Sequence, residues 1–335
     1  MARRTTILFC LLSAIALALF VCDIVVGSVN IPFSDVVGAI SGSADATTRA
    51  IVVDIRLTKA LMALFAGITL SLSGLQMQTL IRNPLAGPYV LGVSSGASFG
   101  VALFLLGAPL LGLSSSPIVS AIGTTGAAWI GAAAVVMMII VLSKRIKDIM
   151  VILILGMMLS SALGAVVEIL QFLSNEAALK SFVVWTMGSL GEVTHSELMF
   201  IVPVITLGVI LAVVTIKPLN ILLLGESYAQ TSGINLTKVR GQVFLSTTLL
   251  AGTVTAFCGP IGFVGLAVPH LAQMIFRTAD HRVLLPASAI IGSAMMLVGD
   301  ILSKLMLLPI NTITALMGIP VVVYILFRNR NLMQC

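Results

Sequence analysis

Charged residues are scarce in this chain. Only 9% of its 335 residues are Asp, Glu, Lys or Arg, whereas 59% are hydrophobic. A typical soluble domain carries about 25% charged residues, so this composition excludes a soluble globular protein, a disordered chain and a nucleic-acid-binding domain. The mean hydropathy of +1.17 indicates an integral membrane protein, whose helices need about 20 mostly apolar residues to cross the bilayer.

Catalytic and metal-binding motifs are also missing from the sequence. The four cysteines, Cys10, Cys22, Cys258 and Cys335, form no Cys-x-x-Cys pair, and we interpret them as small apolar residues. No Gly-x-x-x-x-Gly-Lys-[Ser/Thr] sequence is present, so the chain has no P-loop for ATP. His-Glu-x-x-His is absent too, and Gly92-Val93-Ser94-Ser95-Gly96 fits Gly-x-Ser-x-Gly in its letters but lacks the strand that precedes such a nucleophile in hydrolases. We therefore predict no catalytic residue, no metal ligand and no cofactor bound by this chain.

Runs without charged residues predict ten membrane helices. The longest run covers residues 83–143, and Gly107-Ala108-Pro109 and Ser114-Ser115-Ser116-Pro117 divide it in two, because Gly, Pro and Ser clusters mark turns. Arg3 and Arg4 precede a first apolar run that lacks a cleavage site, so we predict a first membrane helix and not a signal peptide. The helices are predicted at 5–22, 60–81, 90–107, 118–142, 149–167, 198–216, on either side of Gly259-Pro260 within 241–276, at 283–299 and at 305–327.

The distribution of basic residues predicts the orientation. With ten helices and both termini in the cytoplasm, 13 of the 18 Lys and Arg residues lie on the cytoplasmic side, as the positive-inside rule requires. The inner set is Arg3, Arg4, Arg82, Lys144, Arg145, Lys147, Lys217, Lys238, Arg240, Arg277, Arg282, Arg328 and Arg330. We expect one polytopic transmembrane domain over 1–335, with its largest inner loop at about 217–240.

Two segments rich in Gly and Pro resemble each other. One reads Gly-Pro-Tyr-Val-Leu-Gly-Val over residues 87–93, and the other reads Gly-Pro-Ile-Gly-Phe-Val-Gly over 259–265. In the ten-helix arrangement the first follows helix two on the inside and the second follows helix seven on the outside. This placement is typical of an inverted repeat of five plus five helices, an organisation found in transporters.

The same segments carry a family resemblance. Residues 82–97 match the stretch RNPLA-x-P-x-x-LG-[VI]-[ST]-x-GA, and residues 259–270 match GPI-x-FVGL-x-x-PH. Both stretches are typical of FecCD/BtuC-like permeases, the membrane subunits of ATP-binding-cassette importers for ferric siderophores, haem and cobalamin. The resemblance covers residue 50 to the C-terminus. Among the departures, Thr58 and Lys59 stand where the family commonly has Pro-Arg, and Gln273 replaces an Arg.

The resemblance implies a multi-subunit assembly in a bacterial inner membrane. It implies a second permease copy, with a homodimer expected, two ATP-binding-cassette ATPase subunits that bind ATP and Mg, and an external substrate-binding protein. It further implies ATPase coupling by Gly225, Glu226, Ala229 and Gly233, with Glu226 facing a basic residue of the ATPase. A plain solvated loop is the alternative for this segment, since most loops only connect.

The resemblance also implies roles for residues elsewhere in the chain. Asn83 and Leu85 match the cytoplasmic gate, although Asn-Pro also starts ordinary turns. Arg56, Lys59 and Lys304 would dock acidic residues of the binding protein, or else are interfacial cations that snorkel. The pathway-associated motif contributes Gly259, Pro260, Gly262, Pro269 and His270. His270 could equally be a hydrogen-bonded packing residue.

One other class of transporter remains as the alternative function. An ion-gradient-driven secondary transporter usually needs acidic or basic residues near the middle of the membrane. The centres of the apolar runs here carry almost none. We therefore favour the permease of an ATP-driven importer for a bulky metal chelate.

Overall fold

The computed structural model describes residues 2–27, 29–110, 112, 117–146 and 148–328, and within them the chain is all-helical. Helices follow from the long apolar runs, because in hydrocarbon each backbone polar group must be paired within its own segment. Contacts between Cα atoms divide the chain into two compact units. Unit 1 is Met1–Leu75, Ser189–Pro203 and Ile261–Cys335, and unit 2 is Gln76–Gly188 and Val204–Pro260.

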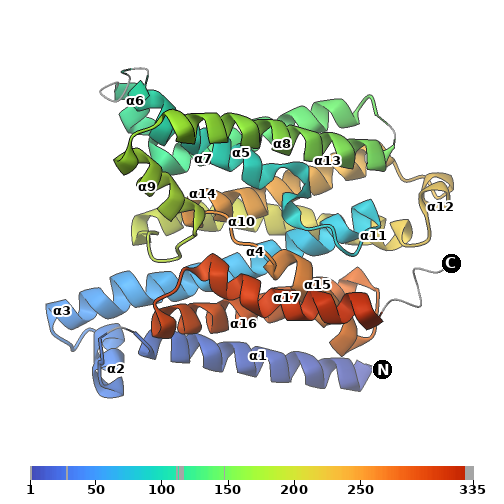
Figure 1. Ribbon diagram of the computed structural model, residues 1–335. Coiled ribbons are helices and arrows are strands. Elements are labelled where there is room, and N and C mark those ends of the chain that lie inside the picture. Colours follow the sequence, from blue (N-terminus) through green and yellow to red (C-terminus); the bar gives the residue numbers. More distant parts are fainter. Residues whose placement is uncertain (1, 28, 111, 113–116, 147, 329–335) are drawn as a thin grey trace. The chain divides into compact units, whose positions relative to one another are not determined.

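Unit 1 is built from the N-terminal and C-terminal parts of the chain (Figure 1). Its long helix α1 packs against α16, and α15, α16 and α17 pack against one another. The elements that begin in it are α1 (Ala2–Val25), α2 (Phe33–Ser41), α3 (Ala46–Arg49), the π-helix η1 (Ala50–Leu57), α4 (Thr58–Ile81), α10 (His195–Val214), α15 (Val264–Phe276), α16 (His281–Met306) and α17 (Ile310–Arg328).

Unit 2 holds the middle of the chain, and α5 packs closely on both α7 and α8. Two further π-helical segments continue α5 and α13. The elements that begin in it are the 3-10 helix η2 (Pro88–Leu91), α5 (Val93–Ala102), η3 (Leu103–Gly107), α6 (Ala108–Leu110), α7 (Pro117–Ser143), α8 (Ile149–Leu173), α9 (Glu176–Thr186), α11 (Ile216–Leu222), α12 (Glu226–Thr231), α13 (Leu236–Thr247), η4 (Thr248–Gly252) and α14 (Thr253–Cys258).

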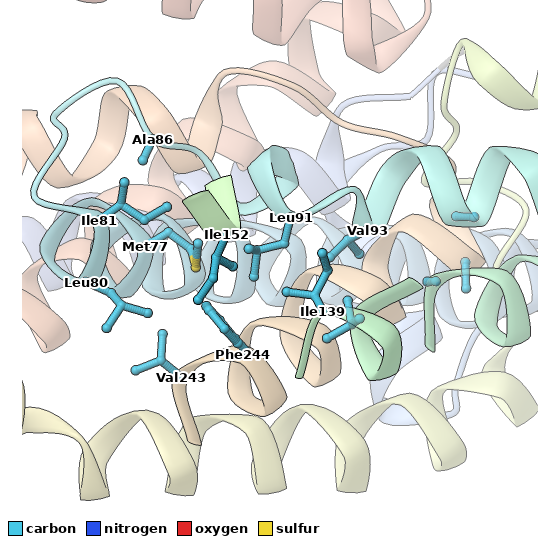
Figure 2. Close-up of a cluster of buried hydrophobic side chains, with 14 of the residues drawn as sticks. Met77, Leu80, Ile81, Ala86, Leu91, Val93, Ile139, Ile152, Val243 and Phe244 are labelled. Atoms are coloured by element: carbon cyan, nitrogen blue, oxygen red, sulfur yellow. The ribbon is translucent and has the colours of Figure 1, made fainter. Parts of the chain in front are cut away.

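Figure 2 shows part of the hydrophobic core of unit 2. Phe244 and Val243 from α13 lie near Ile152 from α8, and Met77 contributes from α4. Glycines let the helices of this unit approach closely. A Cβ at Gly96 of α5 would collide with the carbonyl oxygen of Gly131 of α7. Small residues commonly line helix contacts in membranes, because lipid tails are as apolar as the side chains and the hydrophobic effect contributes little to helix association there.

Unit 1 uses the same device around α4. A Cβ on Gly67 would overlap the backbone of Gly292 in α16, and one on Gly74 would overlap the backbone of Gly265 in α15. The serines of α4 cause no conflict with this packing, because Ser71 and Ser73 donate hydrogen bonds to carbonyl oxygens one turn earlier, at 2.7 Å each. The α4 helix is therefore held between neighbours at backbone contact distance.

The structure confirms an all-helical chain with several apolar helices of membrane-spanning length. Among the described residues, seven helices are long and apolar enough to span a bilayer, and Val264–Phe276 and Ile310–Tyr324 are shorter apolar helices. The count of ten and the inverted repeat stay predictions. The two Gly-Pro segments differ locally, since residues 88–91 form a 3-10 helix and residues 259–263 form none. Lys147, Arg330 and the turn residues Ser114, Ser115 and Ser116 lie outside the described residues.

Candidate functional site

A cavity of about 700 Å³ lies in unit 2 beside the segment that resembles the coupling loop. It is lined by the C-terminal end of α4 and the residue after it, by the start of α8, and by the first turn of α12 with the two residues before it. The lining residues are Ile81, Arg82, Ile149, Met150, Leu224, Gly225, Glu226, Ser227 and Tyr228. Segments that are far apart in sequence, such as Arg82 and Leu224, thus form one surface.

The backbone conformation of this loop depends on its glycines. Gly225 has φ +113° and Gly233 has φ +82°, values that side-chain-bearing residues rarely adopt. Between them α12 turns Ala229 into the core, where it is fully buried. Tyr228 faces outward and is 53% exposed. Two of the predicted coupling residues, Glu226 and Ala229, therefore lie in a short helix that is buried on one side and open on the other, and the coupling role stays a prediction.

Glu226 has a partner within the chain. Its Oε1 accepts a hydrogen bond from Nη2 of Arg240 at 2.9 Å, and the Arg240 side chain is only 4% exposed. This ion pair ties the first turn of α12 to α13. Glu226 keeps 33% of its side chain exposed, so the predicted pairing with a basic residue of the ATPase stays a prediction beside this internal ion pair.

Asn83 and Leu85 form a tight turn directly after α4. The amide N–H of Leu85 donates to Oδ1 of Asn83 at 2.9 Å, and the N–H of Ala86 donates to the carbonyl oxygen of Asn83 at 3.1 Å. The Leu85 side chain is 43% exposed. The alternative that Asn83 organises a turn is thus realised, and a gating role for the two residues stays a prediction.

The second motif is held at both of its ends. Gly259 has φ +74°, and a Cβ there would collide with the carbonyl oxygen of Trp185, so glycine is required on two grounds. In unit 1, the N–H of Gly262 donates to Oδ1 of Asn311 at 3.0 Å. Pro260 lies in the link that separates α14 from α15.

Pro269 and His270 lie within α15, and both are buried. A buried histidine in a helix fits the packing interpretation that the sequence left open. No cluster of three or more His, Cys, Asp or Glu residues suited to a metal ion occurs among the residues that the structure describes.

The three cations predicted to dock a binding protein lie together in unit 1. Arg56, Lys59 and Lys304 line one cavity of about 470 Å³, alongside Gly27, Val29, Ile51, Ile55, Ser303, Leu307 and Leu308. Arg56 is 4% exposed, and its guanidinium donates to the carbonyl oxygens of Ile24, Val25 and Val29 near the end of α1. These contacts hold Arg56 inside the chain rather than at its surface.

The two lysines are engaged with buried acids. Lys304 pairs with Asp23 at 2.8 Å and with Asp300 at 2.8 Å, and Lys59 pairs with Asp300 at 3.0 Å. Both acidic side chains are at most 1% exposed. We call these four residues the ion cluster. Only Lys59, with 21% of its side chain exposed, keeps appreciable access to solvent.

Sequence reasoning missed Asp23 and therefore missed the ion cluster. One feature of the sequence could have revealed it. Asp23 ends the first apolar run, and an acidic residue within an apolar helix usually has a nearby partner. It also missed a polar network in unit 2. Gln76 donates through Nε2 to Oγ1 of Thr215 at 3.0 Å and accepts from Oγ of Ser246 at 3.0 Å, and all three residues are fully buried.

Long apolar helices, motifs that interrupt them with Gly and Pro, and an anchored helix beside an open cavity together define a membrane permease. The FecCD transport family model matches residues 15–328. The chain belongs to the FecCD transport family, which confirms the resemblance found in the sequence.

Individual relatives agree with this assignment. The chain is 34% identical to the hemin transport system permease protein HmuU of Yersinia pestis, with 83% of each chain covered. It is 36% identical to the molybdate import system permease protein MolB of Haemophilus influenzae, covering 82% of this chain and 80% of that one. A solved metal-chelate type ABC transporter in an inward-facing conformation matches with TM-score 0.82 and 28% identity, covering 96% and 99%. These relatives support the importer permease and not the gradient-driven transporter.

Proposed function

We propose that this chain is the permease subunit of an ATP-driven importer for a bulky metal chelate, such as a ferric siderophore, haem or cobalamin. A substrate-binding protein would deliver the chelate, and a separate ATPase would supply the energy. The family match over residues 15–328 supports this reading. A relative named for molybdate is as similar as one named for hemin, so the proposal concerns the chelate class and not one cargo.

The observation that carries the coupling role is the anchored surface around α12. Ala229 seats α12 in the core of unit 2, and the Glu226–Arg240 ion pair joins it to α13. A force on the exposed face of α12 would therefore pass to α13 as a rigid-body shift, one of the common ways in which packed helices switch. The adjoining cavity would receive part of the ATPase.

The remaining parts of the assembly follow from the same proposal. The permease would pair with an identical copy in a bacterial inner membrane and cross it ten times, with both termini in the cytoplasm. Asn83 and Leu85 would close the inner end of the pathway, and residues 259–270 would border it. Lys59, the most accessible lysine of the ion cluster, would be the main docking cation for the binding protein, while Arg56 and Lys304 would shape its surroundings.

A capture experiment tests the proposal. The tagged chain is purified in mild detergent from its native cell, and co-purifying proteins are identified by mass spectrometry. We expect a P-loop ATPase at near equal stoichiometry, and we expect Tyr228→Ala to reduce its recovery. Phe172→Ala, at the opposite end of α8 and 89% exposed, is the matched control and should retain it. If no ATPase co-purifies with the chain even after crosslinking, the importer proposal is refuted, and the gradient-driven transporter becomes the favoured function.

A further inference from the structure

Helix α2 carries more apolar surface than its own chain covers. Residues three or four apart lie on one side of a helix, and Phe33, Val37 and Ile40 follow that spacing. These three side chains are 61%, 50% and 60% exposed. On an adjacent side, Val36 and Ala39 are buried, at 3% and 1%. The apolar arc is therefore half covered and half open.

The rest of the helix is polar. Ser34, Asp35 and Ser41 occupy the side away from the apolar arc, and all three are exposed. Asp35 lies in the first turn, where an acid suits the positive end of the helix dipole. A helix with one polar side and one apolar side of this kind fits a boundary between water and a nonpolar phase.

The packing of α2 places it at the end of a membrane helix. Val36 and Ala39 belong to a small apolar cluster with Ile24 in the last turn of α1 and with Val52 in η1. Residues 3–25 of α1 form a candidate membrane span. In the view of Figure 1, α2 lies crosswise to α1 at that end, the arrangement expected of a helix that lies along the surface of a membrane crossed by α1.

We propose that α2 is an interfacial helix whose Phe33, Val37 and Ile40 side chains are immersed in the lipid of the outer boundary layer. The polar side would face water. Interfacial helices usually add Lys or Arg for anionic headgroups, but α2 contains neither. The exposed part of the apolar arc therefore contacts the acyl-chain region of the bilayer, and the insertion of α2 into lipid should not depend on headgroup charge.

Spin labels on the two sides of α2 test the proposal. In a chain whose four native cysteines are replaced, nitroxide labels are attached at Val37→Cys and, as the matched control, at Asp35→Cys. The labelled chains are placed in lipid nanodiscs. We expect the label at position 37 to collide several-fold more with oxygen than with a water-soluble nickel complex, and the label at 35 to show the reverse. The contrast should be equal in zwitterionic and anionic nanodiscs.

Three outcomes overturn the proposal. Equal water access of the labels at 35 and 37 would leave the exposed part of the apolar arc in solvent. Protection of position 37 only after a substrate-binding protein is added would make α2 a protein-docking surface. A contrast that requires anionic lipid would make the headgroup the ligand. If the labelled variants fail to fold, hydroxyl-radical footprinting of the native chain in nanodiscs replaces them, with Phe33 expected to be protected and modification of Phe33 counting against the proposal.

Discussion

Replacing Lys304 should destabilise the protein far more than replacing Lys59. Lys304 is the only cation within ion-pair distance of Asp23 among the described residues, and it also pairs with Asp300. Lys304→Met therefore leaves Asp23, whose side chain is fully buried, without a compensating charge. Lys59→Met leaves Asp300 still paired with Lys304.

The expected magnitudes differ accordingly. Removing one partner of a buried ion pair costs about 3–5 kcal/mol, because the remaining charge stays desolvated, and we assign this range to Lys304→Met. Lys59 retains 21% exposure, so its pair is weakened by solvent and its loss should cost about 1 kcal/mol. Adding Asp23→Asn to Lys304→Met should recover about 1–3 kcal/mol, the coupling expected within one ion-pair network.

Equilibrium unfolding in mixed micelles measures all of these free energies, with helix content by circular dichroism as the readout. The native chain, the two lysine variants and the double variant are compared under one detergent condition. An equal loss of stability in Lys59→Met and Lys304→Met would show that Lys304 does not compensate Asp23. The absence of any recovery by Asp23→Asn in the Lys304→Met background would show that Asp23 is not the uncompensated charge.

Three further predictions concern packing, the buried network and coupling. Gly74→Ala should cost about 1–3 kcal/mol by overpacking against Gly265, whereas Gly164→Ala, with open space around it, should be neutral or slightly stabilising in the same unfolding assay. Gln76→Leu removes two hydrogen bonds that average about 0.6 kcal/mol each in a membrane protein, so a loss above about 3 kcal/mol would contradict this account. Glu226→Gln leaves the buried Arg240 guanidinium facing a neutral amide, so it should cost about 1–3 kcal/mol and lower ATP-driven uptake in proteoliposomes. Unchanged uptake would show that its ion pair does not position α12.

Local composition made several features of the fold and site predictable. The helix breaks at 83–92 and 259–263 were evident because Gly and Pro cannot continue a helix without loss of hydrogen bonds. The inner loop at about 217–240 was evident from its mixture of polar and apolar residues, and the family resemblance singled out residues 225–233 within it. Both features depend on residues that are neighbours in sequence, and the structure places turns and the short helix α12 there.

Other features could not be predicted from local composition. Arg56 was expected to be a docking cation, but it donates to carbonyl oxygens at the end of α1, about 30 residues away. The three π-helical segments have no distinctive composition, although such segments often occur at functional sites. Helix α2 lay hidden in a predicted loop, because nine residues are too few to mark a span.

The sequence by itself determined that this protein is helical, membrane-embedded and a member of a transport family, because long runs of apolar residues and ordered Gly-Pro motifs are properties of the chain read in one dimension. The tertiary structure alone decided which polar groups meet. Asp23 and Lys304 lie 281 residues apart, and they form an ion pair only because α1 packs against α16. Electrostatic compensation inside a membrane depends on distances of a few ångströms, and those distances are set by helix packing rather than by order along the chain.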